Sequence, residues 1–328
     1  MQGFYSRGRV LHYNARVRLR YFGIAQAGFV IPGEDMRQVH SKYRRRFVFA
    51  LGALPFAHGA MGASDVDEKR TGGPYVPTPQ VVVDEMLKIG RVGAGDFVVD
   101  LGSGDGVIVL TAAEQLKAQG FGVDIDPELV KLSNGEAKKR GIADRAAFYV
   151  QDVFKADISK ATVVTLYLLP GMMINLRPKI LKELKPGTRV VSHDYHFDDW
   201  TPDEQFTWDV PEKEAINGVP KATVYLWIIP ARIAGRWQVS VAAPAAEKFE
   251  LALKQRYQDI DGVVAENGTK ERKLTLSRLV GNDITFAFPS GGDRHLFKGR
   301  VSGETMEGTV QLAGGKGVAK WTAVRIKT

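Results

Sequence analysis

The sequence contains no cysteine, which excludes disulfide bonds, thiolate-bound zinc and a cysteine nucleophile. It also lacks an uninterrupted apolar run of about 18 residues, so we expect no membrane-spanning helix. Hydrophobic residues make up 44% and charged residues 25% of the 328 residues, which are ordinary values for globular proteins. We therefore expect folded domains, and the length indicates two, with three as the upper limit.

Residues 64–328 taken together carry no net charge. The formal net charge is +8, but residues 1–63 alone hold 10 basic and 2 acidic side chains. Residues 64–230 carry a net charge of −6 and residues 231–328 a net charge of +6, so these two parts cancel. Binding to duplex nucleic acid depends on basic side chains that neutralise phosphates. Because the excess basicity is confined to residues 1–63, we expect no nucleic acid partner for the folded body.

Residues 1–63 have the composition of an export leader. Arg44-Arg45 stands before a short apolar stretch, Phe47–Ala57, and small residues follow. A signal peptide consists of a charged region, a short apolar region and a cleavage site with small residues. The paired arginines resemble a twin-arginine signal. We expect export to the periplasm, or a cytoplasmic protein if the leader stays attached as an amphipathic helix. Met36 would be a natural start of translation for such a signal, so we expect that residues 1–35 result from an over-extended reading frame.

Residues 70–230 alternate between strand-like and helix-like segments. Buried strands are predicted at residues 97–101, 120–125, 147–151, 162–169 and 189–192. Helices are predicted after a cap at Thr78 and at residues 107–117, 127–140 and 172–184. This alternation predicts a doubly wound, mostly parallel sheet. Two more strands, 206–210 and 223–229, follow with no helix expected between them, and they predict an antiparallel hairpin at the sheet edge.

A glycine-rich turn joins the strand at 97–101 to the next helix. It has the sequence Asp100-Leu101-Gly102-Ser103-Gly104-Asp105-Gly106. Glycines at this place let the backbone turn tightly and approach a ligand closely. Val107 stands where a dinucleotide-binding fingerprint has its last glycine, which disfavours NAD as the ligand.

Three acidic residues lie at the carboxyl ends of three predicted strands. Asp100 can receive the ammonium of an amino-acid group. Asp124, 22 residues after Gly102, can accept both hydroxyls of a ribose, and Asp152 can accept an adenine amino group. Open α/β sheets bind ligands at the carboxyl ends of their strands. Each acid taken alone is typical of a solvated loop, but their order and spacing predict that they line one pocket.

These segments resemble the class I S-adenosylmethionine-dependent methyltransferases. DLGSGDG matches the first motif of that family, GVDIDP its ribose-binding acidic motif and QDVF its adenine motif. More narrowly, YVPTP, LYLLP and RVVSHDYHFDDW resemble a bacterial branch that is similar to the mitochondrial lysine methyltransferases of the ADP/ATP translocase and the ATP synthase c subunit.

The resemblance implies a seven-stranded Rossmann-like sheet, S-adenosylmethionine as the cofactor and a protein lysine as the acceptor. It also implies a set of cofactor-binding residues: Tyr75, Thr78, Asp100, Gly102, Ser103, Gly104, Asp105, Gly106, Asp124 and Asp152. Thr78 has a purely structural alternative as the cap of the next helix.

Methyl transfer from a sulfonium is an in-line displacement that depends mostly on alignment of the nucleophile with the methyl group. An amine nucleophile must be neutral, although a free lysine has a pKa near ~10.4. We predict three catalytic residues, Tyr167 to orient the amine and His193 and Asp194 to handle its proton. The alternatives are a packed core tyrosine and rim residues bonded to nearby backbone. His193, Asp194, His196 and Asp198 also include metal-ligand types, but the match to a methyltransferase loop favours no metal.

From Arg232 onward the apolar residues alternate with a period of two. Seven strands are predicted, at residues 237–242, 249–257, 273–279, 284–288, 296–301, 305–312 and 320–326. Short strands separated by Gly and Asn turns predict an antiparallel barrel or sandwich in residues 231–328. Two alternatives to an enzyme follow: a non-catalytic nucleoside-binding protein, and a carrier that holds a small ligand in this β domain.

Overall fold

The computed structural model describes residues 73–243, 245–265 and 271–327. The predicted leader, residues 1–63, and the start of the predicted methyltransferase domain at residues 70–72 lie outside the described residues. The described residues form two separate sheets, one of seven strands and one of nine. None of the described helices is long and apolar enough to cross a membrane.

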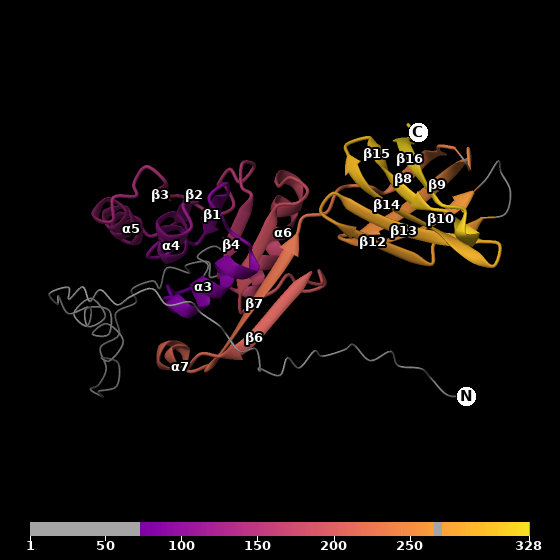
Figure 1. Cartoon of the computed structure of the whole chain (residues 1–328). Coiled ribbons are helices and arrows are strands. Elements are labelled where there is room, and N and C mark those ends of the chain that lie inside the picture. The colour runs from indigo at the N-terminus through magenta and orange to yellow at the C-terminus, as the bar shows by residue number, and fades with distance from the viewer. Residues whose placement is uncertain (1–72, 244, 266–270, 328) are drawn as a thin grey trace, which may run out of the picture. The chain divides into compact units, whose positions relative to one another are not determined.

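The first sheet has the strand order β3-β2-β1-β4-β5-β7-β6 (Figure 1). Five of its strands are parallel: β1 (Phe97–Leu101), β2 (Gln119–Asp124), β3 (Ala146–Val150), β4 (Val163–Leu166) and β5 (Arg189–His193). The remaining two are antiparallel to each other: β6 (Glu204–Asp209) and β7 (Lys221–Ile228). The strand order changes direction between β1 and β4, which is where open α/β sheets bind their ligands. The predicted mostly parallel, Rossmann-like sheet is confirmed.

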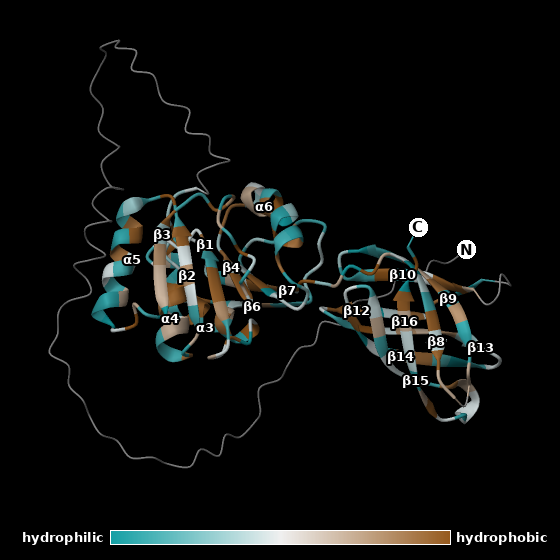
Figure 2. Cartoon of the chain, turned by 90° about the horizontal axis from the view of Figure 1, so that it is seen from above, coloured by the Kyte–Doolittle hydropathy of each residue, from teal (hydrophilic) through white to brown (hydrophobic). Residues whose placement is uncertain are grey.

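Four helices flank this sheet. Three contribute to one hydrophobic core: α3 (Gln80–Ile89), α4 (Val107–Gln115) and α5 (Pro127–Lys139). On the opposite face, α6 (Pro170–Glu183) contributes to a second core with buried side chains of β1 and β4. In Figure 2 the strands lie between these helices, and α5 is coloured partly teal and partly brown. Leu129, Val130 and Ala137 are buried while the lysines and glutamates of the helix lie on its outer side, as expected for an amphipathic helix.

The start of α5 follows directly from its sequence. Asp126 precedes the helix, and its carboxylate accepts a hydrogen bond of 2.8 Å from the Glu128 N–H. Pro127 occupies the first turn, where its missing N–H leaves no helical bond unmade. The helix therefore begins at a fixed point immediately after β2, which keeps the loop from Asp124 to Asp126 short.

The end of the first sheet differs from the prediction. A helix, α7 (Pro211–Asn217), stands between the two last strands, so the expectation of no helix there is wrong. Pro211 lies in its first turn and Gly218 ends it with a φ of 76°. These start and stop signals bracket only seven residues, too few to show an apolar period. Moreover, β7 pairs with both β5 and β6, so the later strand lies inside the sheet and the earlier one at its edge.

The second sheet is a curled antiparallel sheet in the order β11-β10-β9-β8-β16-β15-β14-β13-β12. Its strands are β8 (Gly235–Val241), β9 (Lys248–Arg256), β10 (Asp259–Ala265), β11 (Arg272–Lys273), β12 (Leu276–Val280), β13 (Asp283–Ser290), β14 (Asp293–Ser302), β15 (Thr305–Gln311) and β16 (Val318–Arg325). The segment that contains β11 and β12 pairs with β10 through its first part and with β13 through its second. The two ends of the sheet are therefore joined by one continuous segment.

The predicted all-β class is confirmed for residues 231–328, with two corrections. The strands form one sheet, so a two-sheet sandwich is wrong. The strand Asp259–Ala265 was not predicted. It is separated from β9 by only two residues, Tyr257 and Gln258, with Tyr257 at a φ of 56°. This turn contains neither glycine nor asparagine, so it gives no turn signal in the sequence.

Candidate active site

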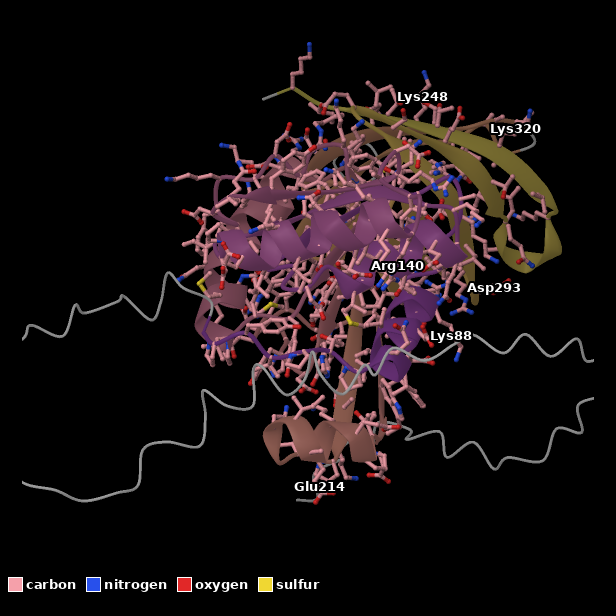
Figure 3. All side chains as sticks on the ribbon, turned by 90° about the vertical axis from the view of Figure 1, so that its left-hand side faces the viewer. Lys88, Arg140, Glu214, Lys248, Asp293 and Lys320 are labelled. Atoms are coloured by element: carbon pink, nitrogen blue, oxygen red, sulfur yellow. The ribbon has the colours of Figure 1, made fainter. Side chains whose placement is uncertain are left out.

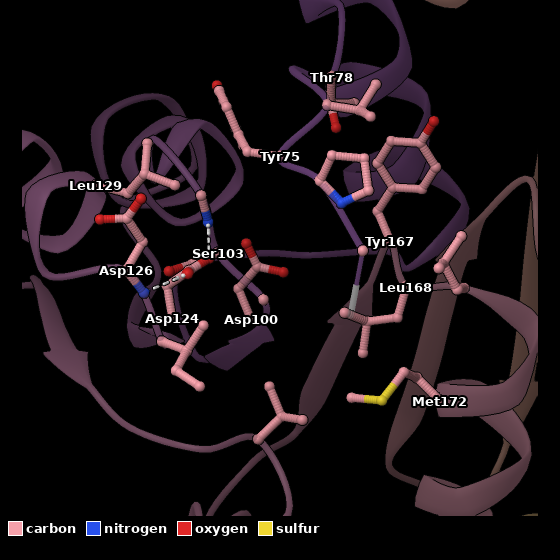
Figure 4. A pocket seen from close by; sticks show the side chains of 18 of the residues that line it. Tyr75, Thr78, Asp100, Ser103, Asp124, Asp126, Leu129, Tyr167, Leu168 and Met172 are labelled. Carbon is pink, nitrogen blue, oxygen red and sulfur yellow. Dashed lines mark hydrogen bonds between the residues drawn. The ribbon is translucent and has the colours of Figure 1, made fainter. Parts of the chain in front are cut away.

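A cavity of about 500 Å³ lies at the carboxyl ends of the parallel strands. Figure 4 shows Asp100 and Asp124 on one side of it, with Tyr167, Leu168 and Met172 opposite. The predicted cofactor-binding residues that line it are Tyr75, Thr78, Asp100, Gly102, Ser103, Gly104, Asp105, Asp124 and Asp152. Gly106 does not line it and instead precedes α4, with a φ of 81°. The three strand-end carboxylates therefore share one cavity.

The glycine turn leaves the cavity wall without side chains at two points. Gly102 has a φ of 82°, and a Cβ there would lie 2.7 Å from Leu168 Cδ2. Gly104 has a φ of 52°, and a Cβ there would lie 2.5 Å from Tyr75 Cε2. Both positions combine a left-handed backbone with a close neighbour, which L-residues with a Cβ tolerate poorly. The turn therefore forms a cradle of bare backbone against which a ligand can lie.

The Asp124 carboxylate accepts hydrogen bonds from two backbone N–H groups beside the cavity. Its Oδ2 accepts a hydrogen bond of 2.8 Å from the Gly104 N–H, and its Oδ1 accepts one of 3.0 Å from the Asp126 N–H. Each carboxylate oxygen can accept more than one hydrogen bond. The side chain is thus held in place by backbone donors and retains lone pairs for hydroxyl groups of a ligand.

Asp100 is the most deeply buried acid of the cavity, with 2% of its surface exposed. The Thr165 hydroxyl donates a hydrogen bond of 2.7 Å to its Oδ1. Burial raises the pKa of the Asp100 carboxyl to about 7, and the nearby acids Asp124 and Asp105 add to that rise. A cationic group placed in the cavity would reverse this effect by favouring the ionised form.

The cavity also leaves one buried polar atom without a partner. Among the described residues, Ser103 Oγ is buried and makes no hydrogen bond. Buried hydroxyl groups are almost always hydrogen-bonded, so an unpaired one indicates a ligand or water at that place. Together with the Asp100 carboxyl and the bare glycine backbone, it fits a ligand with a charged amino-acid end and a nucleoside end.

The far end of the cavity is formed by the loop after β3. Asp152 is held by the Phe154 N–H, which donates a hydrogen bond of 2.9 Å to its Oδ1. Gln151, Ile125 and Leu129 line the cavity beside it. Apolar side chains with one fixed carboxylate suit a flat base that carries an amino group.

Thr78 does not cap the following helix. The residue before α3 is Pro79, and no side chain makes a capping hydrogen bond there. The predicted capping role of Thr78 is therefore wrong. The reason is local: with Pro79 extended at a φ of −57° and a ψ of 143°, Thr78 lies one residue too early to cap and lines the cavity instead.

We call five of the residues that line the cavity the acceptor wall: Tyr167, Leu169, Met172, Tyr195 and Asn217. The rings of Tyr167 and Tyr195 are stacked, with centroids 6.2 Å apart. Asn217 interacts with the Tyr167 hydroxyl. Burial raises the pKa of the Tyr167 phenol to about 12, with Asp194 contributing in the same direction. Tyr167 is therefore a neutral phenol near pH 7 and cannot act as a base.

His193 and Asp194 lie behind this wall and do not line the cavity. His193 is 1% exposed, and its ring centroid is 4.1 Å from that of Tyr167. Its Nε2 lies 3.3 Å from Asp194 Oδ1, yet neither ring nitrogen makes a hydrogen bond within the described chain. Burial lowers the pKa of His193 to about 4, against an opposing effect of Asp194. The imidazole is therefore neutral near pH 7.

In the part of the chain that the structure describes, no three His, Asp or Glu side chains are grouped closely enough to hold a metal ion. His196, from the same loop as His193, instead packs its ring edge against Tyr225 at a centroid distance of 5.7 Å. The loop therefore contributes ring packing rather than a ligand set.

Two residues of this region were not predicted. Asn217 reaches the cavity from the end of α7, and Lys213 of the same helix forms an ion pair with Asp194. No strand end or motif marks either residue, because α7 was itself missed. Its Pro211 and Gly218 were the available signals.

A parallel sheet with a glycine turn and three strand-end acids around one cavity defines the class I methyltransferases that use S-adenosylmethionine. The family model of the ANTKMT methyltransferase domain matches residues 100–204. A protein-lysine N-methyltransferase of Saccharolobus islandicus is 43% identical over 157 residues, which cover 48% of this chain and 93% of that protein. The chain belongs to the family of this Saccharolobus enzyme, and it is an S-adenosylmethionine-dependent methyltransferase.

Two other proteins share the same half of the chain. The lysine N-methyltransferase of the ATP synthase c subunit from Xenopus laevis is 38% identical over 40% of this chain and 58% of its own length. A crystal structure of an RNA methyltransferase from Salinibacter ruber in complex with S-adenosyl-L-homocysteine is 49% identical over 48% of this chain and 96% of its own, with a TM-score of 0.43.

Proposed function

We propose that this methyltransferase acts on the side-chain amine of a lysine in a protein. The observation that carries the proposal is the composition of the acceptor wall. Its five members are two tyrosine rings, two apolar side chains and one amide, and none of the five is charged. Such a wall suits the aliphatic stem of a lysine, and aromatic faces favour a methylated ammonium product.

The relatives support the same substrate class. The Saccharolobus relative that this chain covers almost completely is named a protein-lysine N-methyltransferase, and the Xenopus relative is named a lysine N-methyltransferase. The net charge of −6 in residues 64–230 also suits a cationic acceptor.

The residues of the glycine-turn side would hold the cofactor. Asp100 would receive its ammonium, Asp124 its ribose hydroxyls and Asp152 its adenine amino group, while the backbone at Gly102 and Gly104 lies against it. When bound, S-adenosylmethionine would supply a methyl group bonded to a sulfonium sulfur, and this sulfur would leave as a neutral thioether. No acid is therefore needed to protonate the leaving group.

The acceptor wall has to align the amine and allow its proton to leave. In the transfer, the amine nitrogen would form a bond to the methyl carbon as the carbon–sulfur bond breaks, and the electron pair of that bond would stay on sulfur. Tyr167 stays neutral, so its oxygen can accept an N–H hydrogen bond and point the nitrogen lone pair at the methyl group. The proton lost from the ammonium passes to water, because His193 is buried and its pKa is about 4.

Incubation of the purified protein with methyl-labelled S-adenosylmethionine and host-cell extract tests the proposal. We expect label that protease removes and nuclease does not, with methylated lysine in the acid hydrolysate. Nuclease-sensitive label would identify an RNA acceptor and overturn the proposal. Cofactor binding without any label transfer would instead favour a non-catalytic nucleoside-binding protein.

A further inference from the structure

The acceptor wall is backed by a buried ion pair. Lys213 of α7 is 2% exposed, and its Nζ forms an ion pair with Asp194 Oδ2. The same Nζ donates a hydrogen bond to the carbonyl oxygen of Lys221. Lys213 is thus fixed by two partners from the segments on either side of it.

Asp194 is fixed as firmly as its partner. Its N–H donates a hydrogen bond of 2.7 Å to the Thr223 carbonyl, and its Oδ1 accepts one of 3.1 Å from the Thr223 N–H. Its φ is 61°, a left-handed conformation that non-glycine residues rarely adopt. Strain of this kind persists where surrounding contacts hold it and is concentrated at functional sites.

Stability alone gives a weak reason for such a pair. Removing two charges from water carries a desolvation penalty that their attraction often fails to offset, and apolar residues of similar volume are frequently as stable or more so. The pair is also close to the acceptor wall: Asp194 Oδ1 lies 3.3 Å from His193 Nε2, and the His193 ring packs on Tyr167.

We propose that Lys213 is a positioning residue that cancels the negative charge of Asp194 behind the acceptor wall, so that the incoming lysine is not held there as an ammonium. This inference rests on the proposed lysine acceptor. A lone carboxylate near the amine would stabilise its protonated form, and only the neutral amine can attack the methyl group. Lys213 itself neither gives nor takes a proton in the reaction.

The other groups that face Asp194 cannot supply this cancellation. Tyr167 follows β4, Tyr195 follows β5 and Tyr225 lies on β7, and a tyrosine is neutral or anionic. His193 of β5 is held in its neutral form by burial. Besides burial, Asp194 raises the pKa of both Tyr167 and Tyr225, which places its charge within electrostatic reach of each ring. Among the described residues of this cluster, Lys213 is the one cationic group.

Four variants test the inference. Lys213→Met leaves the Asp194 charge uncompensated, Lys213→Arg keeps a cation, and the double variant Lys213→Met with Asp194→Asn removes both charges. Glu214→Gln is the matched control, because Glu214 lies on the same helix and points away from the domain (Figure 3). Circular dichroism and thermal unfolding first establish that each variant is folded.

The first measurement does not depend on the acceptor. Titration of the His193 imidazole by NMR should show an apparent pKa at least about one unit higher in Lys213→Met than in the wild type, since Asp194 then favours the imidazolium. The double variant and Lys213→Arg should restore the wild-type titration, and Glu214→Gln should leave it unchanged. An unchanged His193 titration in a folded Lys213→Met protein would overturn the inference.

The second measurement uses poly-L-lysine as acceptor. The pH profile of kcat/KM in Lys213→Met should move toward higher pH by about one unit, with about tenfold lower activity at pH 7.5. The double variant should recover the wild-type profile, which a merely structural role for Lys213 would not produce. If the wild type transfers no methyl group to lysine but the His193 pKa still rises in Lys213→Met, the proposed function is overturned. The cancellation of the Asp194 charge by Lys213 is then still supported.

Discussion

Asp124 Oδ2 accepts a hydrogen bond of 2.8 Å from the backbone N–H of Gly104, which ties the end of β2 to the glycine turn after β1. This contact adds to two backbone hydrogen bonds of 2.9 Å, from the Gly102 and Ser103 N–H groups to the Val123 carbonyl, which hold the same two segments together. The same carboxylate is the group expected to hold the ribose. The Asp124 side chain therefore contributes both to positioning of the turn and to binding of the cofactor.

Asp124→Asn should weaken S-adenosylmethionine binding by about 10- to 100-fold, because it removes a charged acceptor worth about 1.5–3 kcal/mol per hydrogen bond. Isothermal titration calorimetry measures the affinity. Asp144→Asn is the control, since Asp144 is exposed in the loop after α5 and does not line the cavity. Equal affinities for the two variants would contradict the role of Asp124.

Cofactor affinity should fall as the pH falls below 7. In the free protein Asp100 has its pKa raised to about 7 by burial, so at lower pH the carboxyl carries a proton that the cofactor ammonium must displace. Affinity then decreases by up to tenfold per pH unit, with release of about one proton on binding. Calorimetry in buffers of different ionisation enthalpy measures both quantities. Asp100→Asn should bind weakly with a flat pH profile.

The stability of the cofactor-free protein should change with pH in the direction opposite to the cofactor affinity. A carboxyl whose folded-state pKa is raised binds its proton more tightly when folded, so its contribution to stability decreases as the pH rises from about 4 to about 7. The thermal shift caused by the cofactor should accordingly be larger at pH 8 than at pH 5.5. An equal shift at both pH values would contradict the assigned ionisation.

Two glycines should respond in opposite ways to alanine. Gly104→Ala places a Cβ 2.5 Å from Tyr75 Cε2 at a φ of 52°, so cofactor binding should be lost and stability should fall by about 1–2 kcal/mol. Gly135→Ala adds a Cβ with nothing within 4 Å inside α5, so stability should rise by about 0.5–1 kcal/mol with binding unchanged. Denaturant unfolding and calorimetry distinguish the two effects.

Thr78→Val should reduce cofactor affinity several-fold without changing the unfolding midpoint. Its side chain lines the cavity and makes no capping bond with α3, so only the ligand loses a hydroxyl partner. Thermal unfolding and calorimetry on the same samples separate the effects. A lower midpoint with unchanged affinity would restore the capping interpretation.

Tyr167→Phe should lower kcat by about 10- to 100-fold while the affinity for S-adenosylmethionine stays the same. The substitution keeps the ring that packs on His193 and removes only the hydroxyl that orients the amine. Tyr149→Phe is the control, because that tyrosine is 54% exposed on β3. A Tyr167→Phe enzyme with unchanged kcat would show that the tyrosine serves packing alone.

The acids on the cofactor side of the cavity could be predicted because they lie at the carboxyl ends of strands. The carboxyl ends of parallel strands meet at one edge, so Asp100, Asp124 and Asp152 had to lie close together once the alternation of strands and helices was recognised. Gly106 does not line the cavity because it stands directly before the start of α4, where its positive φ shapes the turn.

The acceptor side was predicted only in part because its contacts cross the sheet. Asn217 and Lys213 approach Tyr167 and Asp194 through α7, which depends on β7 pairing between β5 and β6. No local pattern shows which strand takes the inner place. The burial of His193 behind Tyr167 likewise follows from tertiary packing, so the sequence showed a titratable histidine but not its neutral, enclosed state.

The helix α7 lies beyond residues 100–204, the span shared with the family model. The glycine turn and the three strand-end acids are encoded within that span, and Lys213 and Asn217 of the opposite side are encoded after it. We predict that changes in α7 alter the choice of polypeptide target while the side that binds the methyl donor stays intact. Enzymes of this kind should therefore be grouped by the segment that corresponds to α7, between β6 and β7, rather than by their glycine turn, when their targets are compared.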